Sequence, residues 1–188
     1  GAASSGSSTT VDLRNATTLN RVTIDLDNST TNDSSEVDGN VTINNMRQGT
    51  EVIVEDSFAA TDDVLTLDGA SGANSLSVKF DDTLTAGETT DFSGQLTANY
   101  DTLTLTTNDA ATDISIALLS ASTNDTLNLS GAGNITITSA TNTTSLDAIE
   151  ASSMTGNITL TSMARHNGAT INLGGGDDSI NWVVTSQA

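Results

Sequence analysis

The feature that most constrains the fold is an alternating stretch at positions 124–139, N-D-T-L-N-L-S-G-A-G-N-I-T-I-T-S. In the runs 126–129 and 135–138, Leu or Ile alternates with Thr or Asn. A period of two with one apolar face is typical of a half-buried β-strand. Between the runs, 130–134 contains residues that tolerate the positive φ of a tight turn. The stretch therefore predicts an acidic lead-in, a strand, a glycine turn and a second strand.

Both halves of this unit recur along the chain. The pattern Asp-x-apolar-x-apolar and the pattern Gly-Asn-(Val/Ile)-Thr-(Ile/Leu) begin at these positions: Asp63, Asp101, Asp125 and Asp178 for the first, and Gly39, Gly133 and Gly156 for the second. The last two glycine copies are 23 residues apart, which is a plausible length for one coil of a solenoid. The aspartate copies follow at irregular intervals of 38, 24 and 53 residues. We interpret the pattern as a degenerate repeat.

The chain as a whole reads as short strands separated by Gly, Asn and Asp turns. Strands are predicted at 19–26, 41–43, 51–54, 64–67, 76–80, 96–100, 103–105, 126–129, 135–138, 158–160, 171–173 and 180–184, whereas 114–120 and 145–153 fit either a strand or a short helical turn. The class is all-β. The spacing of 23–24 residues in the second half favours a parallel β-solenoid or β-roll-like stack, with a β-sandwich as the alternative.

The expected core is thin, because hydrophobic residues make up 35% of the chain and aromatic residues only 3%. We expect Ile135 and Ile137 to face inward and Thr136 to face outward. The aromatic residues are expected to fill or cap the core: Phe58, Phe80, Phe92, Tyr100 and Trp182.

Three segments are expected. Residues 1–10 are small and polar and predict a flexible lead, 11–95 form a β-rich first half, and 96–188 form a β-repeat second half that ends in a glycine/Asp turn. No apolar run approaches 18 residues, so no membrane insertion is expected. Because the chain begins with Gly1, we expect any signal peptide or C-terminal export signal to lie outside this sequence.

The charge is strongly negative. Twenty-four acidic residues against 5 basic ones give a formal net charge of −19. Nucleic acid and anionic membranes are poor partners for such a field. Bound divalent cations, a high-salt habitat or simple solubility would each account for the charge. The excess of Asp over Glu favours cations held in loops, since short carboxylate side chains suit calcium and Asp also favours turns.

Catalysis is poorly supported. His166 is the single histidine, it lies in a turn-like segment, and there is no cysteine, so a nucleophilic triad would depend on that one residue. No H-E-x-x-H motif is present. The adjacent carboxylate pair Asp62/Asp63 would point to opposite faces of a strand, and nothing places Arg47 or Arg165 near an acidic cluster. We expect the chain not to be an enzyme.

The sharpest local motif is N-L-G-G-G-D-D-S-I at 172–180. It fits Gly-x-Gly-x-Asp-x-apolar at Gly174, Gly176, Asp178 and Ile180, and it resembles the repeat-in-toxin nonapeptide, although a leucine replaces the first glycine. In that family, glycine carbonyls and the aspartate carboxylate bind calcium between successive coils. The resemblance implies a calcium site at Gly174, Gly176, Asp177 and Asp178.

A broader resemblance covers residues 96–184. The Thr-rich strand repeats at 100–107, 124–138 and 146–161 lead directly into the glycine/Asp turn. This order is similar to the C-terminal regions of Gram-negative surface-layer proteins of the repeat-in-toxin type. The resemblance implies secretion without an N-terminal signal, calcium dependence and assembly into a two-dimensional lattice on the cell surface.

We therefore expect an extracellular structural module of a bacterial surface layer, stabilised by calcium. Its partners would be other copies of itself and cell-surface polysaccharide. The alternative is an adhesin or carbohydrate-binding module of a large extracellular protein, which a sandwich fold would favour.

Overall fold

The computed structural model describes residues 8–24, 39–55, 58, 63–81, 92–108, 113–120, 125–141, 146–164 and 169–183. These residues form strands and turns, and none of them is helical. The two segments that fitted either a strand or a helical turn, 114–120 and 145–153, contain strands. No helix among the described residues is long and apolar enough to cross a membrane.

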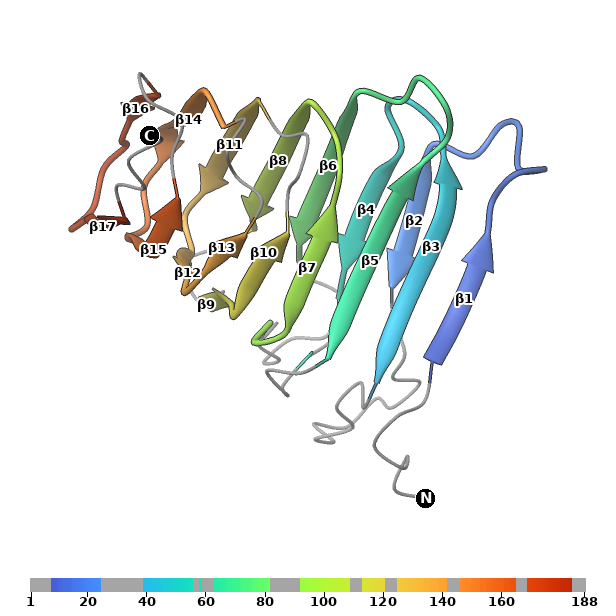
Figure 1. Cartoon of the computed structure of the whole chain (residues 1–188), viewed down its shortest axis with the longest axis horizontal. Helices are drawn as coiled ribbons and strands as arrows, with labels where there is room; N and C mark the ends of the chain where they lie inside the picture. Colours follow the sequence, from blue (N-terminus) through green and yellow to red (C-terminus); the bar gives the residue numbers. More distant parts are fainter. Residues whose placement is uncertain are drawn as a thin grey trace, which may run out of the picture.

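The strands form two sheets that face each other along the length of the molecule (Figure 1). The ten-stranded sheet contains β1 (Ser8–Asp12), β3 (Asn40–Met46), β5 (Val64–Gly69), β7 (Gln95–Ala98), β9 (Asp113–Ile116), β10 (Leu118–Ser120), β12 (Asn134–Ile137), β13 (Ala140–Thr141), β15 (Ile158–Ala164) and β17 (Ser179–Val183). The seven-stranded sheet contains β2 (Arg21–Ile24), β4 (Glu51–Val54), β6 (Ser75–Phe80), β8 (Thr102–Thr107), β11 (Thr126–Gly131), β14 (Ala148–Met154) and β16 (Thr170–Asn172).

The architecture is a β-solenoid. The chain visits the two sheets in turn, with two consecutive strands in the ten-stranded sheet at β9 and β10 and at β12 and β13. Every pairing between the described strands is parallel. Each strand therefore pairs with the equivalent strand of the next coil. The prediction of an all-β parallel solenoid is confirmed, and the sandwich alternative is not adopted.

The core is a stack of inward-facing aliphatic residues. Leu127, Leu129, Ile135 and Ile137 are at most 1% exposed, as the alternating pattern predicts. Thr136, between the two isoleucines, faces outward and is half-buried.

Aromatic residues contribute to this core. Phe92 lies between two others, with ring centroids 5.1 Å from Phe58 and 5.4 Å from Phe80. Tyr100 is also buried. The expected burial of these four residues is confirmed, whereas the side chain of Trp182 lies outside the described part of the chain.

The predicted repeats correspond to coils, but the aspartate pattern combines two different places in the fold. Asp63 and Asp178 precede strands of the ten-stranded sheet, whereas Asp101 and Asp125 precede β8 and β11 of the seven-stranded sheet. Only Asp101 and Asp125 occupy neighbouring coils, since Thr102 pairs with Thr126. The interval of 24 residues is therefore a true coil length, and the other two intervals join residues of different sheets.

The glycine pattern is the more faithful repeat. Its three copies all lead into the ten-stranded sheet, and the last two lie on directly paired strands, with Ile135 opposite Ile158.

The expected segment boundaries are less sharp than the sequence suggests. Strand β1 begins at Ser8, within the expected lead, while 1–7 lie outside the described residues. Pairing of Leu65 with Leu96 carries the stack across residue 95.

Candidate functional site

The predicted calcium-binding residues lie in one turn, between β16 and β17, at the C-terminal end of the stack. Because Thr159 pairs with Ser179 and Leu160 with Ile180, this turn lies directly on the turn that begins at Gly156. The repeat-in-toxin-like motif is thus the next coil's version of the Gly-Asn-Ile-Thr repeat. Asp177 occupies the position of Asn157, and Asp178 that of Ile158.

The glycines of this turn are required by close packing against the coil below. A Cβ atom at Gly174 would lie 2.3 Å from the carbonyl oxygen of Met154. Gly176 has a φ of +99°, and a Cβ atom there would lie 2.8 Å from the carbonyl oxygen of Gly156. The Gly175 N–H donates to the Met154 carbonyl at 2.8 Å. The glycines therefore serve coil stacking, whether or not a cation is bound.

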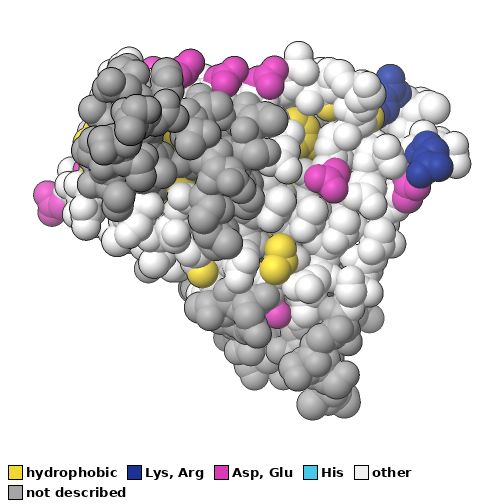
Figure 2. All heavy atoms as spheres, in the orientation of Figure 1, with side chains coloured by type: hydrophobic (Ala, Val, Ile, Leu, Met, Phe, Trp, Pro, Cys, Tyr) yellow, Lys and Arg dark blue, Asp and Glu magenta, His cyan; other side chains and the backbone are white. Residues whose placement is uncertain are grey.

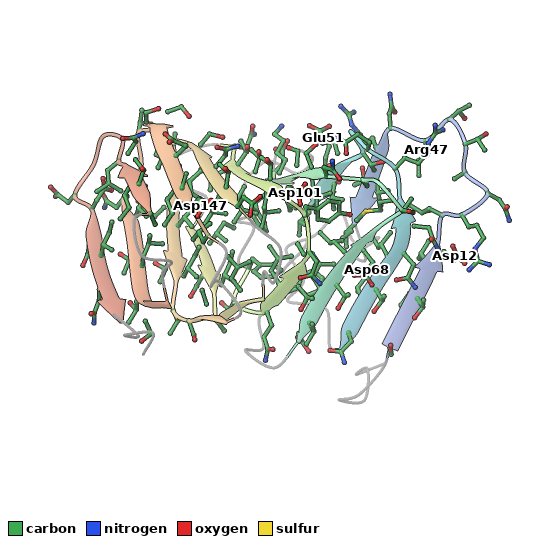
Figure 3. The ribbon with its side chains drawn as sticks, turned by 45° about the horizontal axis from the view of Figure 1, so that its top comes forward. Asp12, Arg47, Glu51, Asp68, Asp101 and Asp147 are labelled. Atoms are coloured by element: carbon green, nitrogen blue, oxygen red, sulfur yellow. The ribbon has the colours of Figure 1, made fainter. Side chains whose placement is uncertain are left out.

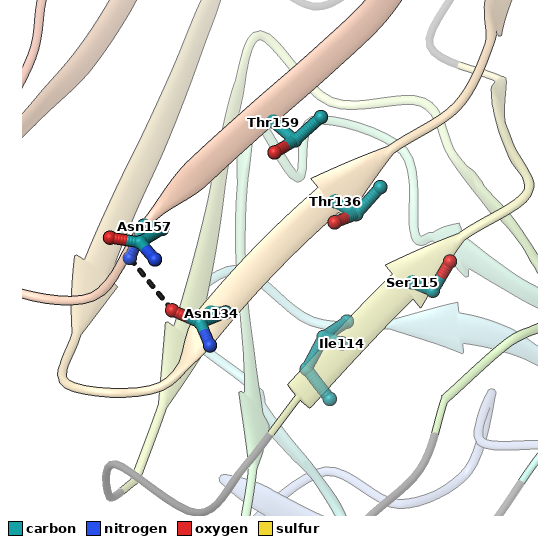
Figure 4. A pocket seen from close by; sticks show the side chains of 6 residues that line it. All are labelled: Ile114, Ser115, Asn134, Thr136, Asn157 and Thr159. Atoms are coloured by element: carbon teal, nitrogen blue, oxygen red, sulfur yellow. Dashed lines mark hydrogen bonds between the residues drawn. The ribbon is translucent and has the colours of Figure 1, made fainter. Parts of the chain in front are cut away.

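The two aspartates also bond to the coil below. Oδ1 of Asp178 accepts a hydrogen bond from the backbone N–H of Ile158 at 2.9 Å. The Asp177 N–H donates to Oδ1 of Asn157 at 2.8 Å, and the Asp177 carboxylate is exposed. One coil further down, the Asn157 N–H donates to Oδ1 of Asn134 at 2.8 Å, the bond drawn in Figure 4. A ladder of side-chain amides thus joins three successive coils.

The turn has the kinds of donor that calcium uses, but few of them. Calcium takes six to eight oxygen ligands from carboxylates, carbonyls and water. Asp177 supplies a free carboxylate, and Asp178 has one oxygen engaged by Ile158. Within the described ranges, no three acidic, His or Cys side chains are close enough to hold a metal ion together. A calcium ion here would depend on glycine carbonyls and water for most of its ligands.

A second acidic feature runs along a corner of the solenoid. Asp101, Asp125 and Asp147 occupy the same position in successive coils, because the Asp125 N–H donates to the Asp101 carbonyl and the Asp147 N–H to the Asp125 carbonyl. All three residues are exposed. Figure 2 shows acidic side chains in a row along one edge of the molecule, and Figure 3 shows Asp101 and Asp147 on neighbouring parts of the stack. Adjacent coils are about 4.8 Å apart, so these like charges repel one another.

A third acidic group is buried. Asp63 is 6% exposed, and its Oδ1 atom accepts a hydrogen bond from the Gly39 N–H at 2.9 Å. Its Oδ2 atom is buried and has no hydrogen-bond partner among the described residues. An unpaired buried carboxylate oxygen is unfavourable, and a cation would satisfy it. Sequence reasoning named this residue as the start of a strand repeat and as a member of the pair Asp62/Asp63, and not as a buried carboxylate. The sequence contained one signal for this position: Asp63 follows Gly39 by 24 residues, which is the length of one coil.

A shallow hollow of about 310 Å³ lies on the outer face of the ten-stranded sheet (Figure 4). Its lining offers two amides and three hydroxyl groups, from Ile114, Ser115, Asn134, Thr136, Asn157 and Thr159. The described residues of this lining include no titratable side chain, so they offer no general acid or base.

The residues weighed for catalysis are not assembled into a site in the described part of the chain. His166, Arg165 and Asp62 lie outside the described residues. Arg47 is exposed in the turn that follows β3.

The chain is therefore a parallel two-sheet β-solenoid with a row of acidic residues along one corner and a glycine/Asp turn before its last described strand. Comparison with protein-family models, with curated proteins and with solved structures found no significant match.

Proposed function

We propose that this chain is a structural module of a secreted bacterial surface layer. The single observation that carries the proposal is the stacking of the glycine/Asp turn on the preceding Gly-Asn-Ile-Thr turn, in register at Thr159 and Ser179. This arrangement makes the repeat-in-toxin-like motif part of a continuing solenoid, which is the context expected for such motifs. The proposal includes an extracellular location at the cell surface and the absence of catalytic activity.

Calcium is the proposed stabilising ion. Support comes from the net charge of −19, the stacked carboxylates at Asp101, Asp125 and Asp147, and the unpaired buried oxygen of Asp63. A divalent cation relieves such repulsion locally, whereas dissolved salt screens only beyond about 8 Å at physiological ionic strength. Gly174, Gly176, Asp177 and Asp178 are the proposed ligands, with Asp63 as a second location.

The proposed partners are other copies of the chain in a surface lattice and cell-surface polysaccharide. Nucleic acid is an unsuitable partner, because its phosphates would be repelled by the acidic surface.

A second candidate function is an adhesin or carbohydrate-binding module. The hollow at Asn134 and Asn157 favours it, since amide and hydroxyl groups are the donors and acceptors that bind sugar hydroxyls.

The test is to add calcium, magnesium or EDTA to the purified chain and to follow assembly by light scattering and electron microscopy. A surface-layer module forms ordered sheets with calcium and does not form them with magnesium or EDTA. A chain that stays monomeric with calcium and binds a glycan array, with binding lost in Asn157→Ala, would establish the second candidate instead.

A further inference from the structure

Among the described residues, the stack of coils has two open ends. At one end β1 and β2 are the outermost strands of the two sheets, and at the other end β17 and β16 are (Figure 1). We call the residues 8–24 the head and the residues 169–183 the tail. Within the described part of the chain, no strand pairs with the outer edge of either end. Open strand edges are templates for pairing with another chain.

Strand β2 shows how the head presents its backbone. The carbonyls of Asn20 and Ile24 accept hydrogen bonds from the Glu51 and Glu55 N–H groups. Because the backbone groups of alternate residues in a strand point to opposite sides, the N–H and C=O groups of Thr23 point away from β4. They are directed toward the open end, as are those of Arg21.

Among the described residues, the exposed large hydrophobic side chains lie at the same two ends. The large hydrophobic residues that are exposed among the described ones are Val11, Leu19 and Leu173, at 42%, 37% and 40%. The first two belong to the head and the third to the tail. The sides of the solenoid show no comparable residue among those described.

Among the described residues, the two ends also carry opposite charge. The described head contains Arg14 and Arg21 against Asp12, a formal charge of +1, and the tail contains Asp177 and Asp178 with no basic residue, a formal charge of −2. In Figure 2, the dark blue side chains visible on this face lie toward the β1 and β2 end. Like charges on both ends would keep two edges apart, whereas opposite charges favour head-to-tail contact.

The register of the seven-stranded sheet shows which residues would meet. One outward-facing column runs through the whole sheet by direct pairing, from head to tail: Arg21, Glu51, Ser77, Thr104, Asn128, Glu150 and Asn172. A second copy that continued this stack would place its Arg21 against Asn172, whose amide already bonds to Glu150 at 2.6 Å. Its Val22 would then lie against the exposed Leu173.

We infer that the tail of one chain docks on the head of a second copy, so that β16 pairs with β2 and β17 with β1 in parallel. The inference rests on the proposed function for the presence of many copies on one surface, and it names the contact that joins them. The contact is heterologous, so repetition produces an open filament. The net charge of −19 opposes association, but at about 0.15 M salt this repulsion extends only about 8 Å and acts mainly between the touching coils.

The test follows association in EDTA, at about 0.15 M salt, by sedimentation velocity over a dilution series. Asn172→Lys places a cation opposite Arg21 of the next copy and is expected to weaken association about tenfold or more. Asn128→Lys is the matched control, since Asn128 also flanks Glu150 in the same column but lies within the stack. Thr23→Pro removes an outward N–H of the head without removing a bond to β4. Circular dichroism and a thermal melt of each variant verify folding.

Mixing the variants gives the most specific result. Thr23→Pro has a blocked head and a free tail, whereas Asn172→Lys has a free head and a blocked tail. Each variant alone is therefore expected to be monomeric. In an equal mixture, the free tail of one variant docks on the free head of the other, and association stops at a dimer. A wild-type chain that stays monomeric at all concentrations, equal effects of Asn172→Lys and Asn128→Lys, or no dimer in the mixture would each overturn the inference. End-to-end association in EDTA does not depend on calcium. If it occurs, but no ordered sheets form when calcium is added, the proposed function alone would be refuted. Sheets with calcium but no association in EDTA would refute the inference alone.

Discussion

Asp178 is stacked on Ile158 of the preceding coil, and its Oδ1 atom accepts the Ile158 backbone N–H at 2.9 Å. Asp63 makes the same kind of bond to the Gly39 N–H, also at 2.9 Å. In both places a carboxylate at the start of a strand in the ten-stranded sheet binds the backbone one coil below. These aspartates therefore have a structural role that does not depend on a bound ion.

Replacement of Asp178 by Ala is expected to lower the free energy of unfolding by about 1–3 kcal/mol in EDTA, because the Ile158 N–H loses a charged acceptor. Asp178→Asn keeps an acceptor and should lose less. Asp177→Ala is the control, since the Asp177 side chain is exposed and only its backbone bonds to Asn157. Urea denaturation measures all three variants. Equal losses in Asp177→Ala and Asp178→Ala would contradict the assigned role.

Calcium is expected to raise the free energy of unfolding of the wild-type chain by about 2.7 kcal/mol at 100 times its dissociation constant. Magnesium should do much less, because it gives up its water reluctantly and requires a tighter octahedron. Thermal melts in EDTA, magnesium and calcium make the comparison. If wild type and Asp178→Asn gain equally from calcium, the ion binds elsewhere, and Asp63→Asn becomes the variant to measure. Equal gains from magnesium and calcium would mean that the acidic surface is merely solvated.

The orientation of β12 is tested by a pair of neighbouring substitutions. Ile135→Asp places an unpaired charge in the core and is expected to cost more than about 4 kcal/mol, enough to prevent folding. Thr136→Asp lies on the outer face and should be tolerated. Circular dichroism and expression as soluble protein distinguish the two outcomes, and equal damage from both changes would contradict the observed alternation.

Gly131 is expected to tolerate no side chain. Its φ is +117°, and a Cβ atom would lie 2.0 Å from the carbonyl oxygen of Thr107 on the neighbouring coil. Gly131→Ala should therefore lower the free energy of unfolding by about 2 kcal/mol or more. Gly175→Ala is the control, since the nearest atom to its Cβ would be 3.8 Å away. Chemical denaturation that showed equal stability for the two variants would refute this packing.

Stability at high pH is expected to depend on Tyr100, the only tyrosine of the chain. Burial, with a smaller contribution from the charge of Asp68, raises the pKa of the Tyr100 hydroxyl. An unfolded tyrosine ionises near pH 10, so above this pH the folded chain holds a proton that the unfolded chain has released. The free energy of unfolding then falls as the pH rises, and below about pH 10 the contribution is fully present. Tyrosinate absorbance follows the titration, and a pH dependence of stability unchanged in Tyr100→Phe would contradict this assignment.

The strand content and the inward faces could be predicted from the sequence because the side-chain period of a strand is visible in the residues themselves. Leu127, Leu129, Ile135 and Ile137 alternate with polar neighbours, and all four are buried. The coil length was visible where two copies lie in adjacent coils of one sheet, as at Gly133 and Gly156. Segment 114–120 was ambiguous because a short apolar run fits a strand or a buried helical turn equally well.

The place of the aspartates could not be predicted, since the pattern Asp-x-apolar-x-apolar describes a strand start and not the sheet to which the strand belongs. Asp63 and Asp101 share this pattern but precede strands of different sheets. The terminal turn was identified as a possible calcium site, whereas its hydrogen bonds to Asn157 and Ile158 depend on which coil lies below it. That information follows from register, which becomes apparent when 176–180 is aligned with 156–160.

The parallel stacking of coils also determines how the molecule would respond to force. The hydrogen bonds between coils run along the long axis, and β1 and β17, the first and last described strands, lie toward opposite ends of that axis (Figure 1). Tension applied through the two ends of the chain would therefore act across the bonds between coils, and an outermost coil would peel away before the next one yields. A coil of 24 residues, the interval between Thr102 and Thr126, would release about 80 Å of extended chain. A lattice built from such modules would lengthen in steps under strain instead of fracturing.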